Sequence, residues 1–261
     1  MISLEPKIEH NQIRLGARLP RTQVFNYYKA EEGERLEFRL FYHGPLPPER
    51  CEDRNAVGGG GFGRARQKHE LRKHFHRQMR ELWAQDPGLR AQSELWFRFN
   101  QNQGMVYPPD AKMIVPAASN EPGAMRYIEH LADEHKRCGG RFIPLVRDTG
   151  LTCSLDILFL RRDDPGNLIE TGGDIDNRIK VLFDGLRMPR VVSELGGLSI
   201  EADEDPFYCL LQDDRLITSV SVTTDRLITP IAPGESIHDV TLVIHVTVVN
   251  PTAIFAGGRM V

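Results

Sequence analysis

The chain has 261 residues, of which 40% are hydrophobic and 26% charged, and its formal net charge is −3. This composition is typical of a globular protein with a sizeable core, and the charge argues against a protein that coats nucleic acid non-specifically. The sequence has no apolar run of about 18 residues and no signal-peptide pattern near its start, so we expect a cytoplasmic protein without membrane contact. The four cysteines form no CxxC pair, which predicts reduced thiols rather than a zinc knuckle.

The charges are unevenly distributed along the chain. Residues 64–80 hold seven Lys/Arg against one acid, whereas residues 161–215 hold seven Lys/Arg against thirteen acids. A basic and an acidic element in one domain suit a site that holds a polyanion and a cation together. Two solvated faces would give the same pattern.

The first part of the chain predicts an extension, a strand and a loop. Residues 1–34 contain few apolar clusters and are expected to form an N-terminal extension. RLEFRLFY at 35–42 alternates apolar and polar residues, which predicts a strand. AVGGGGFG at 56–63 is expected to be a flexible loop or a loop that cradles phosphate, because glycines let backbone N–H groups approach an anion. It lacks the GK[ST] of a P-loop.

The clearest helix follows at 64–85. Leu71, Phe75, Met79 and Leu82 recur at helical spacing, and DPG at 86–88 ends the helix. Its other faces are basic, and we expect them either to contact nucleic-acid phosphates without reading sequence or to be a solubilising surface. The predicted phosphate contacts are Arg64, Arg66, Lys68, Arg72, Lys73 and Arg77.

The remaining elements indicate the fold class. We expect strands at 94–99, 142–148, 151–163, 207–212, 215–224 and 239–249, a long loop at 100–123 and a second helix at about 122–137. Strands and helices mix without strict alternation, which predicts an α+β fold with a mixed or mostly antiparallel sheet and helices packed on it. We expect one domain at 35–250, with insertions at about 100–123 and 189–206, and a C-terminal tail at 251–261.

The stretch GGDIDNRIKVLFDGL at 172–186 predicts a loop that leads into a helix. Asp176 is suited to cap the helix, and apolar residues from Ile179 onward give it a buried stripe. Lys180 lies four residues from both Asp176 and Asp184, so part of the pattern is explained by a salt-bridge ladder on a surface helix. That explanation leaves Asp174 without a role.

Two carboxylates two residues apart, after a strand, can both point at one cation. Hard divalent ions such as Mg²⁺ take one or two carboxylates and let substrate phosphate complete the shell. Asp213 and Asp214 lie between two predicted strands, where turn chemistry is the other explanation. If the sheet brings that turn beside Asp174 and Asp176, the acids and Lys180 have the composition expected for metal-assisted phosphodiester hydrolysis.

DIDNRIKVLFDGL, followed downstream by LQDDRLI, resembles the signature of the RusA family of Holliday-junction resolvases. In that family D-x-D-N-x-x-K opens a helix and an acidic pair introduces a later strand. The resemblance covers residues 150–225 well and residues 36–84 more loosely. It implies a RusA-like fold, a homodimer, and cleavage of four-way DNA junctions with Mg²⁺ or Mn²⁺. By this resemblance Asp174, Asp176 and Asp214 are catalytic metal-binding carboxylates, Asp213 is the neighbouring acid of the metal site, and Lys180 is the catalytic lysine.

The expected function is therefore a Mg²⁺-dependent endonuclease that cuts branched DNA, such as a four-way junction or a flap. Two other functions stay open. The chain can be a non-catalytic nucleic-acid-binding or assembly protein that retains the fold. It can also be a metal-dependent phosphatase or nuclease acting on small or RNA substrates, with the same site residues.

Overall fold

The structure is a computed structural model that describes residues 35–46, 62–101, 112–148, 150–162, 175–236 and 239–249. The predicted extension 1–34, most of the glycine-rich loop at 56–63 and the predicted tail 251–261 lie outside the described residues. Asp174 lies outside them too.

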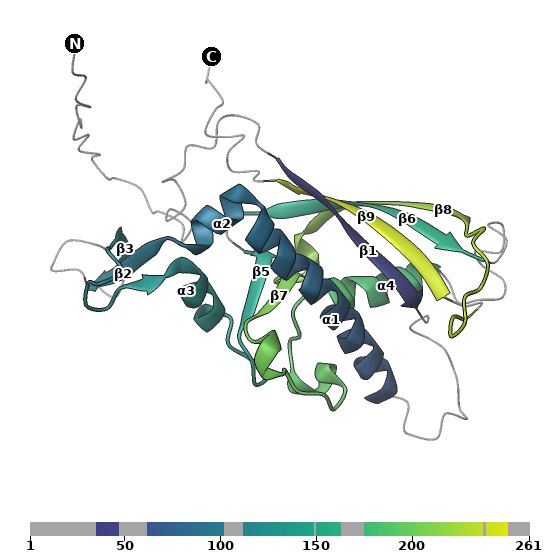
Figure 1. The fold of residues 1–261 in the computed structure, drawn as a ribbon, viewed down its shortest axis with the longest axis horizontal. Coiled ribbons are helices and arrows are strands. Elements are labelled where there is room, and N and C mark those ends of the chain that lie inside the picture. Colours follow the sequence, from purple (N-terminus) through teal and green to yellow (C-terminus); the bar gives the residue numbers. More distant parts are fainter. Residues whose placement is uncertain are drawn as a thin grey trace, which may run out of the picture.

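Among the described residues, the main sheet has four strands in the order β1-β9-β6-β8 (Figure 1). Their bounds are β1 Leu36–Pro45, β6 Thr152–Arg161, β8 Ile217–Arg226 and β9 Asp239–Val249. Strand β9 is antiparallel to both β1 and β6, whereas β8 is parallel to β6. The predicted α+β class with a mixed sheet is confirmed at this level.

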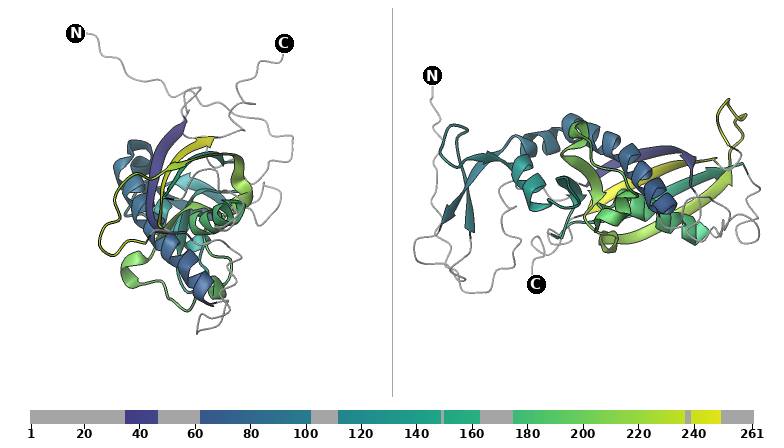
Figure 2. Two further views of the ribbon diagram at one scale, coloured as in Figure 1. Left: turned by 90° about the vertical axis from the view of Figure 1, so that its right-hand side faces the viewer. Right: turned by 90° about the horizontal axis from the view of Figure 1, so that it is seen from below.

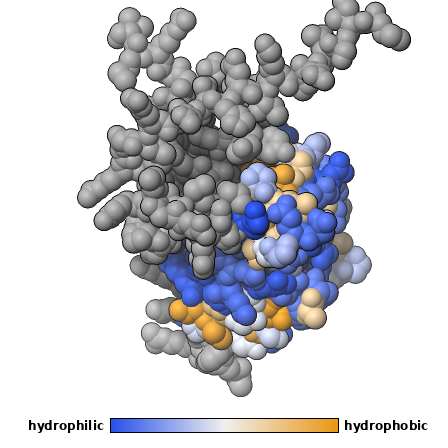
Figure 3. Space-filling view, turned by 90° about the vertical axis from the view of Figure 1, so that its left-hand side faces the viewer, coloured by the Kyte–Doolittle hydropathy of each residue, from blue (hydrophilic) through white to orange (hydrophobic). Residues whose placement is uncertain are grey.

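In the part of the chain that the structure describes, two smaller sheets accompany the main one. Strands β5 (Phe142–Val146) and β7 (Phe207–Leu211) pair in parallel. Strand β2 (Trp96–Gln101) pairs antiparallel with β3 (Lys112–Pro116) and β4 (Met125–Arg126). The described residues that are visible in Figure 3 are mostly hydrophilic, with apolar ones in small groups.

Helices α1 (Phe62–Gln85) and α4 (Ile175–Leu186) pack against each other and against β7. The predicted stripe on α1 is confirmed, since Leu71, Phe75 and Met79 are buried in the core with Leu155, Ile157 and Phe159 of β6. Gly185 permits the close approach of α4 to α1. A Cβ atom there would lie 2.6 Å from Cδ2 of Leu71, closer than real contacts allow.

Two shorter helices complete the described part of the fold. Helix α1 ends before Asp86, as DPG predicts. The Asp86 side chain then accepts a hydrogen bond from the Leu89 N–H and caps α2 (Pro87–Ser93), a helix that the sequence pattern did not predict. Helix α3 (Tyr127–Glu134) is shorter than the predicted 122–137.

Two sequence-based expectations about 94–137 are wrong in part. The predicted long loop at 100–123 contains β3, because Met113, Ile114 and Val115 pair with β2. Met125 was expected inside a helix but lies in β4 opposite Phe97. In both cases backbone pairing with β2 decides the conformation, and local sequence pattern does not report a distant partner strand.

None of the helices in the described ranges is long and apolar enough to cross a bilayer. The sheet is twisted, with β1 along one edge and β8 along the other, and α1 crosses one face of it (Figure 2).

Candidate functional site

Helix α4 carries Asp176 and Lys180 on its exposed side. Lys180 Nζ lies 3.3 Å from Asp176 Oδ2, and each side chain is 56% exposed. Asp176 Oδ1 also accepts a hydrogen bond from the Asn177 N–H. The helix begins at Ile175, so the expectation that Asp176 is the N-cap is wrong: it lies in the first turn. Its side chain remains exposed to solvent.

The acidic pair lies in a turn that contacts α4. Asp213 caps the 3-10 turn η4 (Asp214–Leu216) by accepting a hydrogen bond from the Arg215 N–H, 3.2 Å away. The turn packs against α4, and the Met188 N–H, just after α4, donates to the Leu211 carbonyl at the end of β7. The helix that carries Asp176 and Lys180 and the turn that carries the acidic pair are therefore neighbours in the fold.

Two arginines that the sequence did not single out face the acidic pair. Nη2 of Arg190 lies 3.1 Å from Asp213 Oδ2 and 3.0 Å from Asp214 Oδ1. Nε of Arg187 lies 3.9 Å from Asp214 Oδ2. Burial raises the pKa of Asp213, but the Arg215 N–H, a hydrogen bond with Asp214 and the Arg190 guanidinium outweigh it and hold that pKa below its ordinary value. Asp213 is thus ionised at neutral pH and has a cationic partner within the chain.

Asp184 forms no salt bridge with Lys180 in the described part of the chain, so this part of the predicted salt-bridge ladder is wrong. It lies 2.6 Å from Lys68 Nζ on α1 and also pairs with Arg187. Burial raises the pKa of Asp184, and the two cations more than offset this, so its pKa is below the ordinary value. Asp184 is a bridge between α1 and α4, because its partners come from α1 and from the residue after α4.

The carboxylates that the structure describes do not by themselves form a metal cage. Within the described ranges, no three His, Cys, Asp or Glu side chains lie close enough together to hold an ion. Asp176, Asp213 and Asp214 carry the oxygen donors that Mg²⁺ and Mn²⁺ prefer, so the chemistry of the donors fits such an ion. The fourth predicted ligand, Asp174, is outside the described residues.

The predicted phosphate contacts on α1 divide into two groups. Arg64, Arg66 and Arg77 are exposed. Lys68, Arg72 and Lys73 are bonded to acids of the same chain.

Arg72 departs most from the expectation, because it is buried and its side chain is only 1% exposed. Its guanidinium donates to the Arg187 carbonyl at 3.1 Å, to the Glu194 carbonyl at 2.9 Å and to Glu194 Oε2 at 3.0 Å. Helical periodicity places Arg72 on the polar side of α1, but the 3-10 turn η2 (Val192–Leu195) covers it. In this fold Arg72 joins α1 to η2 and presents no surface to phosphate.

The predicted insertion at 189–206 lies along the basic side of α1. It consists of turns, η2 and a second 3-10 turn, η3 (Ala202–Glu204). Lys73 Nζ lies 3.0 Å from Glu201 and 3.1 Å from Glu204, and Arg80 donates to the Asp203 carbonyl. The basic and acidic segments of the sequence therefore pair in part with each other.

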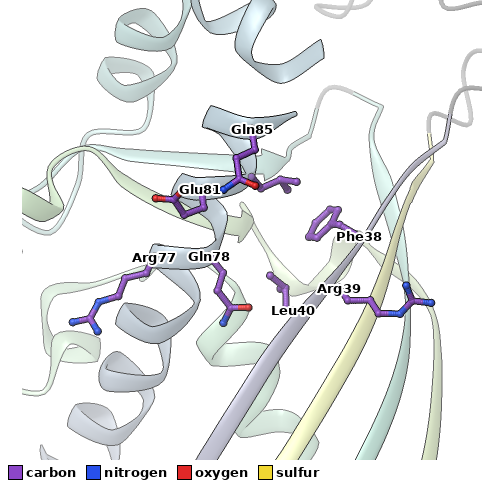
Figure 4. A pocket seen from close by; sticks show the side chains of 8 residues that line it. Phe38, Arg39, Leu40, Arg77, Gln78, Glu81 and Gln85 are labelled. Atoms are coloured by element: carbon purple, nitrogen blue, oxygen red, sulfur yellow. Dashed lines mark hydrogen bonds between the residues drawn. The ribbon is translucent and has the colours of Figure 1, made fainter. Parts of the chain in front are cut away.

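A groove of about 400 Å³ lies between α1 and β1. Its lining includes Phe38, Leu40, Gln78 and Arg77, but none of the predicted metal-binding or catalytic residues. Figure 4 shows Arg77 extending away from Phe38 and Leu40, on the other side of α1. The groove and the acidic turn are thus separate features.

The structure brings the acidic pair to the motif helix and adds Arg187 and Arg190 to it. A pair of arginines three residues apart, directly after the predicted helix, is the sequence signal that could have identified them. No protein-family model, curated protein or solved structure matches this chain. The resemblance to RusA stays a prediction based on the motif.

Proposed function

We propose that this protein is a divalent-metal-dependent endonuclease that hydrolyses phosphodiester bonds in branched DNA, resembling the RusA resolvases, and that it acts as a homodimer. Asp174, Asp176 and Asp214 would hold Mg²⁺ or Mn²⁺, with Asp213 beside them. When bound, the ion would activate water and neutralise charge on the phosphoryl oxygens.

One observation carries the proposal: α4, which presents Asp176 and Lys180 to solvent, contacts η4, which begins at Asp214. Residues separated by more than thirty positions in the sequence thus come from neighbouring elements. Lys180, on the exposed side of α4, would stabilise the negative charge that develops on the phosphate or on the leaving oxygen. Arg64, Arg66 and Arg77 would supply contacts to the backbone of the DNA.

The test uses full-length protein on four-way junction, flap and duplex substrates with Mg²⁺. We expect cleavage of a branched substrate by the wild type and its loss in Asp176→Asn. Because the Asp176–Lys180 ion pair is exposed, its removal changes the free energy of unfolding by only about 0.5 kcal/mol. Asp156→Asn is the matched control, since Asp156 is an exposed carboxylate on β6, and it should cleave like the wild type. Equal cleavage by Asp176→Asn would refute the proposed site.

A second candidate is a nucleic-acid-binding or assembly protein without catalysis. The observation in its favour is that Arg190 already pairs with both Asp213 and Asp214. Contacts of this kind are sufficient for a purely structural role, in which Asp213 and Asp214 stabilise the turn through Arg190. Junction binding without cleavage by the wild type under Mg²⁺ or Mn²⁺ would favour this candidate over the nuclease.

A further inference from the structure

The four carboxylate oxygens of the acidic pair, Asp213 and Asp214, all face cationic or N–H groups of this chain. Oδ1 of Asp213 accepts a hydrogen bond from the Arg215 N–H at 3.2 Å, and its Oδ2 lies 3.1 Å from Nη2 of Arg190. Oδ1 of Asp214 lies 3.0 Å from the same Nη2, and its Oδ2 lies 3.9 Å from Nε of Arg187. A divalent cation that uses these oxygens therefore meets arginine side chains that are already in place.

The two arginine side chains differ in how firmly the fold holds them. The side chain of Arg187 is only 5% exposed, and it donates to Asp184 Oδ1 at 2.9 Å and to Glu194 Oε2 at 2.9 Å. The side chain of Arg190 is 49% exposed, and within the described residues it bonds only to the acidic pair. Arg190 can therefore leave the two carboxylates without breaking any other described side-chain contact, whereas Arg187 cannot.

The backbone at Arg190 is anchored although the side chain is exposed. The Arg190 N–H donates to Glu194 Oε2 at 3.3 Å. Glu194 is itself held by the guanidinium groups of Arg72 and Arg187, both of which are buried. Movement at this position is therefore confined to the side chain, and the guanidinium stays close to the acidic pair when it is displaced.

The charge of the acidic pair sets Arg190 against a metal ion. Mg²⁺ and Mn²⁺ bind through one or two carboxylates, and water and substrate phosphate supply their other ligands. An ion at the acidic pair lies next to the Arg190 guanidinium, where the two positive charges repel each other. The ion and the guanidinium cannot both make their best contacts with the same oxygens, so binding of one weakens binding of the other.

We propose that Arg190 is a built-in competitor of the divalent cation at Asp213 and Asp214, and that it sets the metal concentration at which this part of the site fills. The inference rests on the proposed function, in which the same two acids contribute to a Mg²⁺ or Mn²⁺ site. It assigns Arg190 a role that a purely structural contact does not have, because removing a competitor strengthens metal binding.

Mn²⁺ alone is the probe, and its binding to the full-length protein is measured from the loss of the EPR signal of the free ion. Arg190 makes two exposed ion pairs, and the loss of two such pairs corresponds to roughly a three- to tenfold change in a dissociation constant. We therefore expect Arg190→Gln to bind Mn²⁺ more tightly than the wild type by that factor. The gain should disappear when Asp213 and Asp214 are both replaced by asparagine, because the competition takes place at their oxygens.

Two further arginines provide matched controls. Arg215 pairs with Asp148 at 2.9 Å, and its Nε lies 3.9 Å from Asp213, so Arg215→Gln should change the dissociation constant for Mn²⁺ by less than about twofold. Arg90→Gln removes the same charge from an exposed position on α2 and measures the effect of net charge alone.

Several outcomes would overturn the competition. These are unchanged or weaker Mn²⁺ binding by Arg190→Gln, an equal gain in Arg90→Gln, a gain that persists without the two acids, and no Mn²⁺ binding by any variant. Failure of the proposed function gives a different result. Tighter Mn²⁺ binding by Arg190→Gln, together with a wild type that cuts no DNA, would refute only the nuclease. DNA cleavage by a wild type whose Mn²⁺ affinity does not depend on Arg190 would refute only the role of Arg190.

Discussion

Replacing Arg72 tests whether this residue joins two elements of the fold or contacts a ligand. Arg72→Met keeps the length of the side chain and removes three hydrogen bonds, two to backbone carbonyls and one to Glu194. Breaking a buried ion pair by removing one partner costs about 3–5 kcal/mol. Glu194 keeps a bond of 2.9 Å from Arg187, so its carboxylate does not become unpaired. We therefore expect the lower end, about 3 kcal/mol.

Urea denaturation of the wild type and Arg72→Met at neutral pH measures this difference in the free energy of unfolding. Arg66→Met is the matched control, because Arg66 is an exposed arginine on the same helix, and it should change stability by less than about 0.5 kcal/mol. If Arg72 were a phosphate contact, its variant would lose affinity for a DNA junction with no change in unfolding. That outcome, or a loss of stability no larger than that of Arg66→Met, would refute the structural role.

Two further predictions concern stability. Gly196 has a φ of +62°, and a Cβ there would lie 2.1 Å from the Arg66 backbone nitrogen, so Gly196→Ala should lower the free energy of unfolding in urea by more than about 2 kcal/mol. Gly123 also has a positive φ but open space around it, so Gly123→Ala should lower it by about 1 kcal/mol. Equal losses of stability in the two variants would contradict this reasoning. Burial, with smaller contributions from neighbouring cations, lowers the pKa of His69 and His76 from 6.5 to about 4. Both rings are therefore neutral in the fold, whereas the unfolded chain takes up protons below 6.5, so stability should fall by on the order of 2 kcal/mol per histidine between pH 7 and pH 5. His69→Met should make that pH dependence shallower, and an unchanged slope would show that His69 does not titrate on unfolding.

The sequence by itself determined the elements whose pattern is local and strong. The stripe of Leu71, Phe75 and Met79 predicts α1, and the alternation along β1 predicts a strand, because burial of one face selects for a fixed period. The motif also placed Asp176 and Lys180 on one exposed side of a helix, since residues four apart are neighbours there. The class of the fold followed from the order of these elements.

Only the tertiary structure decided which charges meet. Arg72 and Arg66 are both polar-side residues of α1 by their periodicity, yet one is buried and the other exposed. The difference arises because η2, more than a hundred residues later, packs over Arg72, and Glu194 of η2 accepts hydrogen bonds from it through its carbonyl and its carboxylate. A local pattern reports the preference of a residue for its own helix and contains no information about a segment that folds onto it later.

The same reason applies to the acidic pair and to the edge of the sheet. The sequence identifies Asp213 and Asp214 as acids in a turn. Their pairing with Arg187 and Arg190 depends on the contact between the end of α4 and the end of β7, which only the structure shows. The exposure of Val220 on β8 is likewise a property of the assembled fold, since its neighbour Leu155 on β6 is buried. Residue types and local hydrophobic periodicity can be read from the sequence directly. Contacts between distant segments depend on the packing of the whole core, which a local pattern does not contain.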